Sequence, residues 1–322
     1  MKARALWYVA PNRAELHEEI LPSPAPDQCL VRMLASSISR GTERLVWRGG
    51  VPASQWAAMR APLQAGDFPF PVKYGYAGVG VVEEGPAALL GRRVFCLHPH
   101  QDRFLAPAAM CIPLPDAVPE SRAVLAANME TALNILWDAR PLAGERALVI
   151  GAGVVGLLAT ALLARIPGID LAVCDADATR APLVASLGGR FCTSDAAPPE
   201  RELIIHASGS AAGLRLALAC AGFEARILEA SWHGDALVPL PLGEAFHAKR
   251  LALISTQVGA IAAPMRGRRS HAERLALALA LLDDARLDAL LGPPLPFADL
   301  PAALPRLLGE AGGPPCPLVT YP

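Results

Sequence analysis

One segment near the middle of the chain, residues 146–177, restricts the possible folds more than any other part of the sequence. It begins with an apolar run at 146–150 and continues with glycines at G-x-G-x-x-G spacing and a long apolar stretch. A second apolar run follows and ends at Asp175. This order of strand, glycine turn, helix, strand and acid is typical of the first unit of a dinucleotide-binding domain.

Each residue type in this segment has a physical reason to be there. Gly151 permits a tight turn, Gly153 lets a pyrophosphate approach the backbone, and Gly156 lets the helix pack closely on the strand. The first helical N–H groups then face the phosphates, and a carboxylate 19 positions after the last glycine accepts hydrogen bonds from a ribose. The contacts predicted here come from Gly151, Gly153, Val154, Val155, Gly156 and Asp175.

A membrane-spanning helix is the main alternative interpretation of the same segment. Residues 147–164 are 18 positions without a charge, which reaches the length that a transmembrane helix needs. However, three glycines crowd the first third of the run, and Arg146 and Arg165 bracket it tightly. A buried strand-turn-helix unit accounts for all of these features, whereas a membrane span accounts only for the hydropathy.

Composition narrows the class of protein further. The 322 residues suffice for two domains, and 29 basic against 30 acidic residues give no electrostatic case for binding nucleic acid or an anionic membrane. The seven cysteines include no C-x-x-C pair, and the N-terminus has no signal-peptide pattern. We therefore expect a cytoplasmic globular protein with reduced thiols.

The texture of the sequence changes twice along the chain. The first 120 residues contain short apolar runs between Pro and Gly clusters, which is typical of antiparallel β-structure; helical and strand patterns alternate from about 121, and the Pro-rich texture returns near 286. This predicts an α/β protein. A doubly wound parallel-sheet (Rossmann) domain at 121–285 is flanked by one discontinuous β-rich domain made of 1–120 and 286–322.

The chain resembles the medium-chain dehydrogenase/reductase superfamily almost from end to end. The matching segments are ISRGTERLVWRG (38–49), FPVKYGYAGVGVVEEG (70–85), GRRVFCLHPH (91–100), ANMETALNIL (127–136), the glycine fingerprint and ASGSAAGLRLAL (207–218). The SISRGTE segment is most similar to the branch that includes bacteriochlorophyllide dehydrogenase-like proteins. The resemblance implies a GroES-like β-rich catalytic domain and a nicotinamide cofactor.

The family's zinc ligands are missing from the positions where the resemblance places them. Those positions fall at Ser39 or Arg40, at residues 73–75 (Lys, Tyr, Gly) and at Ala127, and they hold no competent set of thiolates, imidazoles and acids. The four-cysteine structural lobe is missing after Val94. Zinc is therefore expected to be absent.

One metal alternative stays open, since Cys96, His98 and His100 recur at every second position and would share one face of a regular strand. The competing interpretation is that Pro99 disrupts the strand and leaves a histidine-containing loop beside the substrate. In that case His98 is a candidate for substrate contact or proton transfer.

Without zinc, hydride transfer needs another group to stabilise or protonate the reacting oxygen or carbon. The resemblance puts Tyr74 where the zinc-binding histidine would be, so its phenol is a candidate donor or else a buried aromatic. Thr42 matches the proton-relaying Ser/Thr of zinc enzymes. The predicted catalytic residues are thus Thr42, Tyr74 and His98, with Glu43 as a supporting partner.

Further cofactor contacts are implied by the resemblance. Thr131 matches a residue that contacts the nicotinamide, Ser208 lies in the matching ASGSAAG segment, and Arg40 could neutralise a pyrophosphate or a substrate carboxylate or be an exposed loop charge. Asp175 repels a 2′-phosphate and no arginine follows it directly, so NAD(H) is preferred over NADP(H).

The function expected from the sequence is a zinc-independent NAD(H)-dependent oxidoreductase that acts on a small-molecule alcohol, ketone or activated double bond. The alternatives are a catalytically inactive dinucleotide-binding sensor or assembly protein, and a zinc dehydrogenase with displaced ligands. Aromatic residues in the loop at 46–67 suggest an apolar substrate, and a homodimer is implied by resemblance alone.

Overall fold

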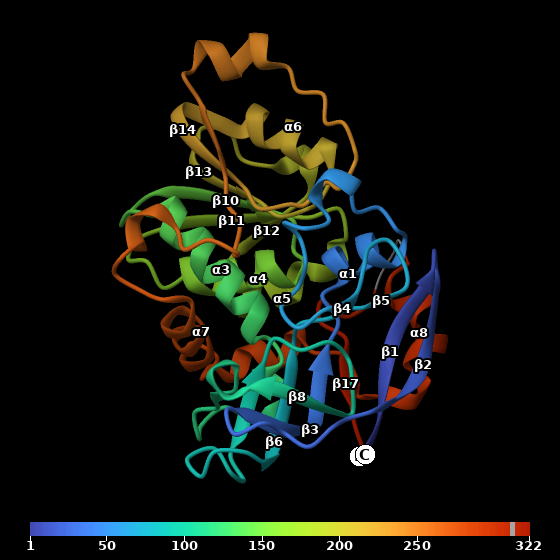
Figure 1. Cartoon of the computed structure of the whole chain (residues 1–322). Coiled ribbons are helices and arrows are strands. Elements are labelled where there is room, and N and C mark those ends of the chain that lie inside the picture. The colour runs from blue at the N-terminus through green and yellow to red at the C-terminus, as the bar shows by residue number, and fades with distance from the viewer. Residues whose placement is uncertain (310–312) are drawn as a thin grey trace. The chain divides into compact units, whose positions relative to one another are not determined.

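A computed structural model describes residues 1–309 and 313–322 (Figure 1). The chain divides into two compact units. The first unit comprises Met1–Ala127 together with Leu275–Pro322, and the second comprises Asn128–Arg274.

The second unit is built on a six-stranded parallel sheet with the order β12-β11-β10-β13-β14-β15. Counted along the chain this is 3-2-1-4-5-6, the order of a doubly wound dinucleotide-binding domain. Its strands are β10 (Arg146–Ile150), β11 (Asp170–Cys174), β12 (Arg190–Cys192), β13 (Arg201–His206), β14 (Ala221–Glu229) and β15 (Ala252–Ser255). The predicted Rossmann class is confirmed.

Helices cover both faces of this sheet, with α6 on one face and α4 and α5 on the other (Figure 1). The central strands begin with a charged residue and are apolar over most of their remaining length, because both of their faces are buried there. The helical elements of this unit are α3 (Ala126–Ala139), α4 (Val154–Leu163), η3 (Ala178–Arg180), α5 (Ala181–Ser186), η4 (Ser194–Ala196), α6 (Ala211–Cys220), η5 (Leu242–Phe246), η6 (Ala263–Met265) and α7 (His271–Ala280), of which α3 and α7 extend across the unit boundaries.

The uncharged run at 147–164 folds as strand β10, a glycine turn and helix α4, and not as one continuous helix. Nine of the ten residues of α4 are buried, which explains its membrane-like hydropathy. Within the described residues, no helix is long and apolar enough to cross a membrane.

The first unit is β-rich and draws on both ends of the chain. C-terminal strand β17 pairs with β3, so the segment after residue 275 completes a sheet begun near the N-terminus. Its strands are β1 (Lys2–Ala10), β2 (Arg13–Ile20), β3 (Gln28–Ser37), β4 (Ala65–Gly66), β5 (Val72–Lys73), β6 (Gly78–Glu84), β7 (Arg93–Cys96), β8 (Arg103–Pro107), β9 (Ile112–Pro113), β16 (Leu295–Pro296) and β17 (Leu318–Thr320). The predicted discontinuous β-rich, GroES-like domain is confirmed.

Short helices fill the connections of this unit. They are α1 (Arg40–Trp47), η1 (Ala53–Gln55), η2 (Ala108–Met110), α2 (Glu120–Ala123), η7 (Ala285–Leu290), η8 (Phe297–Asp299) and α8 (Leu300–Leu307). A core of buried Cys29, Val31, Met33, Val94 and Phe104 lies between its strands.

The sequence pattern predicts domain boundaries at 120/121 and 285/286. Both positions lie inside the β-rich unit, in α2 and η7. An ion pair between Arg122 and Asp288, 2.7 Å from Nη2 to Oδ2, joins these two helical pieces. The helical residues that follow the strands in sequence thus belong to the β-rich unit because of their packing partners. The local pattern of residue types does not reveal partners that are distant in sequence.

Helices α3 and α7 are joined inside the second unit by a buried ion pair. Arg274 is 2% exposed and its Nε donates to Glu130 Oε1 at 3.0 Å, while Nη1 donates to Asn134 Oδ1 and Nη2 to the carbonyl of Val258. Burial raises the pKa of Glu130 despite the opposing effect of Arg274. The Glu130 carboxylate thus has a structural role, since it binds Arg274.

Replacing Arg274 with leucine should therefore destabilise the chain by about 3–5 kcal/mol, because Glu130 is left buried and uncompensated. Urea unfolding monitored by circular dichroism measures the change. The exposed Arg250, paired with Glu224 on the surface of the same unit, provides the control: Arg250→Leu should cost about 1 kcal/mol or less. Equal losses in the two variants would contradict the assignment.

Candidate functional site

The turn between β10 and α4 is held by backbone contacts that only glycine permits. Gly151 has a φ of +107° and its N–H donates to the carbonyl of Cys174 at 2.8 Å. A Cβ at this position would lie 2.7 Å from the amide nitrogen of Ser208. The first glycine of the fingerprint is therefore required by the turn and by the adjacent end of β13.

The other two glycines have different roles. A Cβ at Gly156 would lie 1.8 Å from the carbonyl oxygen of Gly151, so helix α4 can approach β10 only if residue 156 has no side chain. A Cβ at Gly153 would meet no atom within 4 Å. No contact among the described residues requires a glycine at 153, and the open space beside it fits the approach of a ligand's phosphate to the backbone.

The start of helix α4 and the end of β11 complete this edge of the sheet. Gly153 is the N-cap, so the N–H groups of Val154 and Val155 belong to the first turn, where intrahelical acceptors are lacking. Asp175 accepts hydrogen bonds from Ala152 N at 2.6 Å and from Asp177 N at 2.8 Å. The carboxylate is thereby fixed beside the glycine turn, and each oxygen keeps a second lone pair for a ligand hydroxyl.

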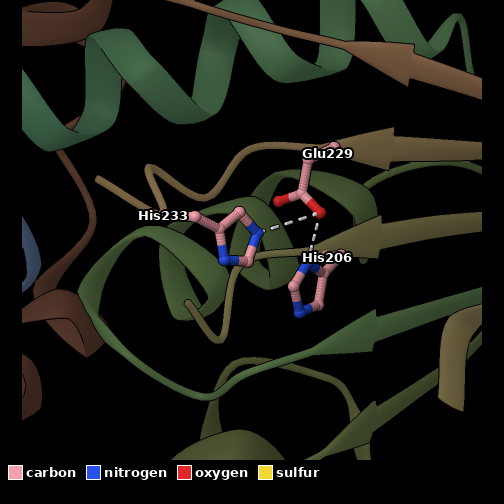
Figure 2. A group of neighbouring side chains, drawn as sticks. All are labelled: His206, Glu229 and His233. Atoms are coloured by element: carbon pink, nitrogen blue, oxygen red, sulfur yellow. Dashed lines mark hydrogen bonds and ion pairs between the residues drawn. The ribbon is translucent and has the colours of Figure 1, made fainter. Parts of the chain in front are cut away.

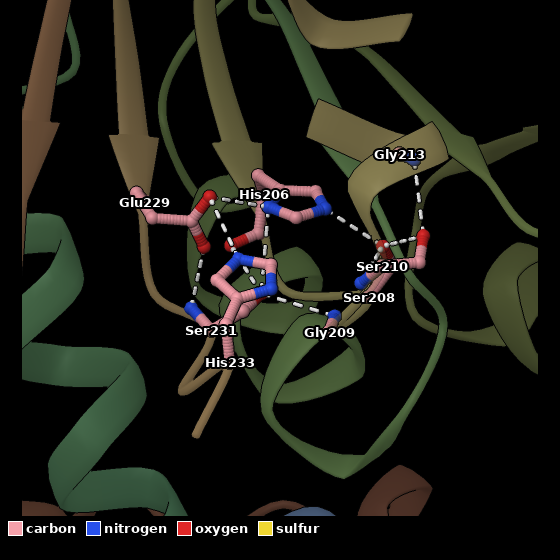
Figure 3. Close-up of polar contacts among 8 residues, drawn as sticks. All are labelled: His206, Ser208, Gly209, Ser210, Gly213, Glu229, Ser231 and His233. Carbon is pink, nitrogen blue, oxygen red and sulfur yellow. Dashed lines mark hydrogen bonds and ion pairs between the residues drawn. The ribbon is translucent and has the colours of Figure 1, made fainter. Parts of the chain in front are cut away.

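A cluster of polar side chains lies at the ends of the two neighbouring strands β13 and β14 (Figure 3). His206 and Glu229 end these strands in register, and His206 Nδ1 lies 2.7 Å from Glu229 Oε2. The other ring nitrogen, Nε2, lies 2.7 Å from the hydroxyl of Ser208, which is exposed. Ser231 N donates to Glu229 Oε1 at 2.7 Å. Burial opposes the ionisation of Glu229, but the hydrogen bond from His206 and further donors leave its pKa lowered overall.

His233 is the third titratable member of this cluster (Figure 2). Its Nε2 is 3.6 Å from Glu229 Oε2, and its ring lies nearly parallel to that of His206 at 6.1 Å. Within the described residues, the group of His, Cys, Asp and Glu side chains able to hold a metal ion consists of His206, Glu229 and His233. No feature of the sequence analysis pointed to these three residues.

In the β-rich unit, Glu43 is the centre of a second buried network. Its carboxylate accepts hydrogen bonds from Tyr8 Oη at 2.9 Å and from the backbone N–H of Ser39 at 2.8 Å, and it lies 3.0 Å from His100 Nε2. His100 Nδ1 in turn lies 2.8 Å from the hydroxyl of Ser36. The supporting role predicted for Glu43 fits this arrangement.

Two phenols and a threonine lie next to this network. Tyr76, and not Tyr74, hydrogen-bonds with Ser39 and Thr42, and burial raises the pKa of Tyr76 to about 12 although both hydrogen bonds lower it. Tyr74 is 3% exposed and its ring packs on those of Phe68 and Tyr76. Burial raises the pKa of Tyr74 well above its usual value. Both phenols are protonated at neutral pH.

The alternating Cys96, His98 and His100 do not gather around a common point. Cys96 belongs to a thiol cluster with Cys29 and Cys111, His100 binds Glu43, and the ring of His98 stacks on Phe104 at 3.8 Å. Burial lowers the pKa of His98 to about 3, so this imidazole is neutral at physiological pH. The structure does not support a metal site formed by these three residues.

The positions of the family's zinc ligands offer no zinc-binding chemistry. Ser39 is the N-cap of α1, Tyr74 is a packed phenol, and Ala127 has no donor atom. A zinc ion at these positions does not fit the residues present.

The remaining predicted contacts are distributed over both units. Arg40 Nε donates to the carbonyl of Leu307 at 2.9 Å, and Thr131 lies half-buried on α3. Their roles toward a cofactor stay predictions, as do those of the other residues singled out in the sequence. All seven cysteines are buried and free.

Comparison with known proteins gives a consistent result. No family model matches the chain. It is 27% identical to 5-exo-hydroxycamphor dehydrogenase of Pseudomonas putida over 268 residues, 68% of this chain and 70% of that protein. An alcohol dehydrogenase of Escherichia coli CFT073 complexed with NADH has a TM-score of 0.79, with 16% identity and 99% of each chain covered. The same TM-score, identity and coverage apply to a protein described as a zinc-binding dehydrogenase of Sinorhizobium meliloti 1021, bound to NADP.

The chain shares the fold of these dehydrogenases over 99% of its length. The resemblance inferred from the sequence motifs is thus confirmed at the level of the fold. At these identities the medium-chain dehydrogenase likeness establishes the fold, and the chemistry must be argued from the residues of this chain.

The contrast between Gly153 and Gly156 leads to a paired prediction. Gly153→Ala should leave the thermal unfolding temperature nearly unchanged and weaken NADH binding at least tenfold, because its methyl group occupies ligand space only. Gly156→Ala should lower the unfolding temperature by several degrees or prevent folding, because the methyl group overlaps the carbonyl of Gly151. Calorimetric titration and thermal denaturation measure the two effects. Normal cofactor affinity in Gly153→Ala would contradict this interpretation.

The buried His98 leads to a prediction about pH. Its pKa of about 3 lies below the value of about 6.5 in the unfolded chain, so below pH 6.5 the unfolded chain binds a proton that the folded chain does not. The free energy of unfolding should therefore fall as the pH drops from 6.5 toward 3. His98→Leu should make this decline shallower, as measured by urea unfolding at several pH values. Replacement of the exposed His17 by leucine serves as the control. If the free energy of unfolding declined equally steeply with pH in His98→Leu and in the parent, the assignment would be refuted.

Proposed function

We propose that this protein is an NAD(H)-dependent oxidoreductase that needs no zinc at the family's ligand positions. Its substrate is a small-molecule alcohol or ketone, or an activated double bond. The observation that carries the proposal is the carboxyl edge of the parallel sheet. There, the glycine turn, the first turn of α4 and Asp175 are assembled on the sheet order typical of dinucleotide-binding domains.

The residues present fit a nicotinamide dinucleotide. The space beside Gly153 admits a phosphate, and the N–H groups at the start of α4 can donate to it. Asp175 is held where it can accept ribose hydroxyls. When bound, the cofactor supplies or accepts a hydride, and the chain's own groups handle the accompanying proton.

Preference for NAD(H) over NADP(H) is part of the proposal. The carboxylate of Asp175 repels a 2′-phosphate, and the nearest arginine along the chain, Arg180, lies 3.3 Å from Asp177 in an ion pair. These residues therefore do not form a basic pocket for the extra phosphate of NADP(H). The related structures include one with NADH and one with NADP, so they favour neither cofactor.

The proton donor that we propose is the pair Thr42 and Tyr76. Hydride addition to a carbonyl creates an alkoxide, which must be protonated as it forms. A protonated phenol that is hydrogen-bonded to a threonine hydroxyl can donate at neutral pH, and burial, together with the charge of nearby Glu43, raises the pKa of the phenol. Tyr74, the phenol favoured by the sequence, has only aromatic packing partners among the contacts described above.

The loop at 46–67 supports an apolar substrate. Trp47 is buried, whereas Trp56 is 36% exposed and borders an open cavity of about 380 Å³ together with Ala57, Arg60, Asp67 and Phe68.

A homodimer and a cytoplasmic location stay predictions.

Turnover with NADH tests the proposal. Incubation with a panel of ketones, aldehydes and enones should give substrate-dependent NADH oxidation, unchanged after treatment with a chelator. Tyr76→Phe and Thr42→Ala should lower kcat by about 10²-fold or more and leave the Kd for NADH unchanged. Tyr74→Phe is the matched control, because it removes a neighbouring phenol, and it should retain most of the activity.

Asp175→Ala should weaken NADH binding at least tenfold and reduce the preference for NADH over NADPH, whereas Asp195→Ala, an exposed acid of the same unit, should do neither. If NADH binds tightly but no substrate is turned over, the inactive sensor or assembly protein becomes the better account. That alternative is favoured by the same vacant ligand chemistry at Ser39, Tyr74 and Ala127.

A further inference from the structure

Three side chains at the carboxyl edge of the parallel sheet form a cluster that the proposed oxidoreductase chemistry does not use. His206 ends β13 and Glu229 ends β14, and His233 follows four residues after Glu229. The nearest ligand atoms of the three lie within 4.8 Å of one another (Figure 2). All three belong to the α/β unit, and two of them are fixed on neighbouring strands of one sheet.

The hydrogen bonds of this cluster are satisfied with one exception. His206 has Ser208 on one ring nitrogen and Glu229 on the other, and Glu229 accepts from the backbone of Ser231 (Figure 3). By contrast, Nε2 of His233 is buried without a hydrogen-bond partner among the described residues. A buried ring nitrogen that faces a carboxylate at 3.6 Å without a hydrogen bond indicates that something else belongs between them.

We propose that His206, Glu229 and His233 bind a divalent transition-metal ion such as Zn²⁺. Two imidazoles and one carboxylate are the ligand set of three-ligand zinc sites that keep one coordination position open. This site uses none of the residues at the family's zinc positions.

Two of the three separations between ligand atoms bracket the value that an ion would require. In a tetrahedral site with bonds of about 2.0–2.1 Å, ligand atoms lie about 3.3 Å apart. Glu229 Oε2 is 2.7 Å from His206 Nδ1 and 3.6 Å from His233 Nε2. The ligand atoms of the two histidines lie within 4.8 Å of each other, so the side chains would have to draw together around a bound ion.

The surroundings of the ligands also match a metal site. A metal-bound imidazole usually donates its other N–H to an oxygen, which fixes the ring. Ser208 Oγ is placed to accept that bond from His206, and Ser208 lies 2.9 Å from Ser210 Oγ, so it is held in turn. Nitrogen ligands favour zinc, cobalt, nickel or copper over magnesium and calcium, which prefer all-oxygen sites.

The competing interpretation is a metal-free hydrogen-bonded cluster, in which a protonated His233 pairs with Glu229. Titration with metal separates the two interpretations. The full-length protein is first dialysed against a chelator and then titrated with Zn²⁺ against a chromophoric competitor and, separately, with Co²⁺ while the visible spectrum is recorded. One equivalent of each ion should bind, Mg²⁺ should not compete, and the cobalt spectrum should lack thiolate-to-metal bands, because no cysteine is a proposed ligand.

His233→Ala and Glu229→Gln should each weaken Zn²⁺ binding by more than 100-fold, since losing a direct ligand costs more than the 10- to 100-fold typical of outer contacts. His233 and Glu229 are only partly buried, so these variants are expected to fold, and their circular dichroism spectra check this. His247→Ala, which removes an exposed histidine from the same unit, is the matched control and should bind as the parent does.

Failure to bind Zn²⁺ or Co²⁺, or unchanged affinity in both ligand variants, would overturn the proposal, as would a cobalt site with thiolate bands that survives His233→Ala. The readout is metal binding and not turnover. A negative result here therefore leaves the proposed oxidoreductase function unaffected, and absence of NADH oxidation leaves the metal site unaffected.

Discussion

The close approach of helix α4 to strand β10 is the constraint on which the cofactor edge depends. The two elements meet where Gly156 faces the carbonyl of Gly151, and the space left there is smaller than one methyl group. This contact sets the position of the first turn of α4. It also sets the turn whose Ala152 N–H is bound by Asp175, so one missing side chain determines the geometry of the phosphate and the ribose positions together.

The fold could be inferred from the sequence to a large extent because its signals are local. The strand, turn and helix at 146–163 follow from apolar runs and glycine spacing within 18 residues, and strands at 201–206 and 221–229 follow in the same way. The boundaries between the two units were harder to predict from the sequence. Helix α2 belongs to the β-rich unit because Arg122 reaches Asp288, a partner 166 residues away, and texture along the chain carries no information about such a pair.

The residues of the proposed metal site were not predicted from the sequence, for a related reason. His206 and Glu229 are 23 residues apart and meet only because β13 and β14 are neighbours in the sheet. A usable signal existed, since each is the polar residue that ends an apolar strand, as Asp175 is just after β11. Similarly, Tyr76 and not Tyr74 contacts Thr42. Both phenols lie in the irregular segment between β5 and β6, where Gly75 has a φ of +127°, so the sequence spacing alone does not tell which of them enters the polar network.

The two polar networks, Glu43 with His100 and His206 with Glu229, share no residue and no secondary-structure element. Each network is held by contacts within its own unit. In evolutionary terms, such a chain can change the residues that handle a substrate proton while keeping those at the sheet edge, or the reverse.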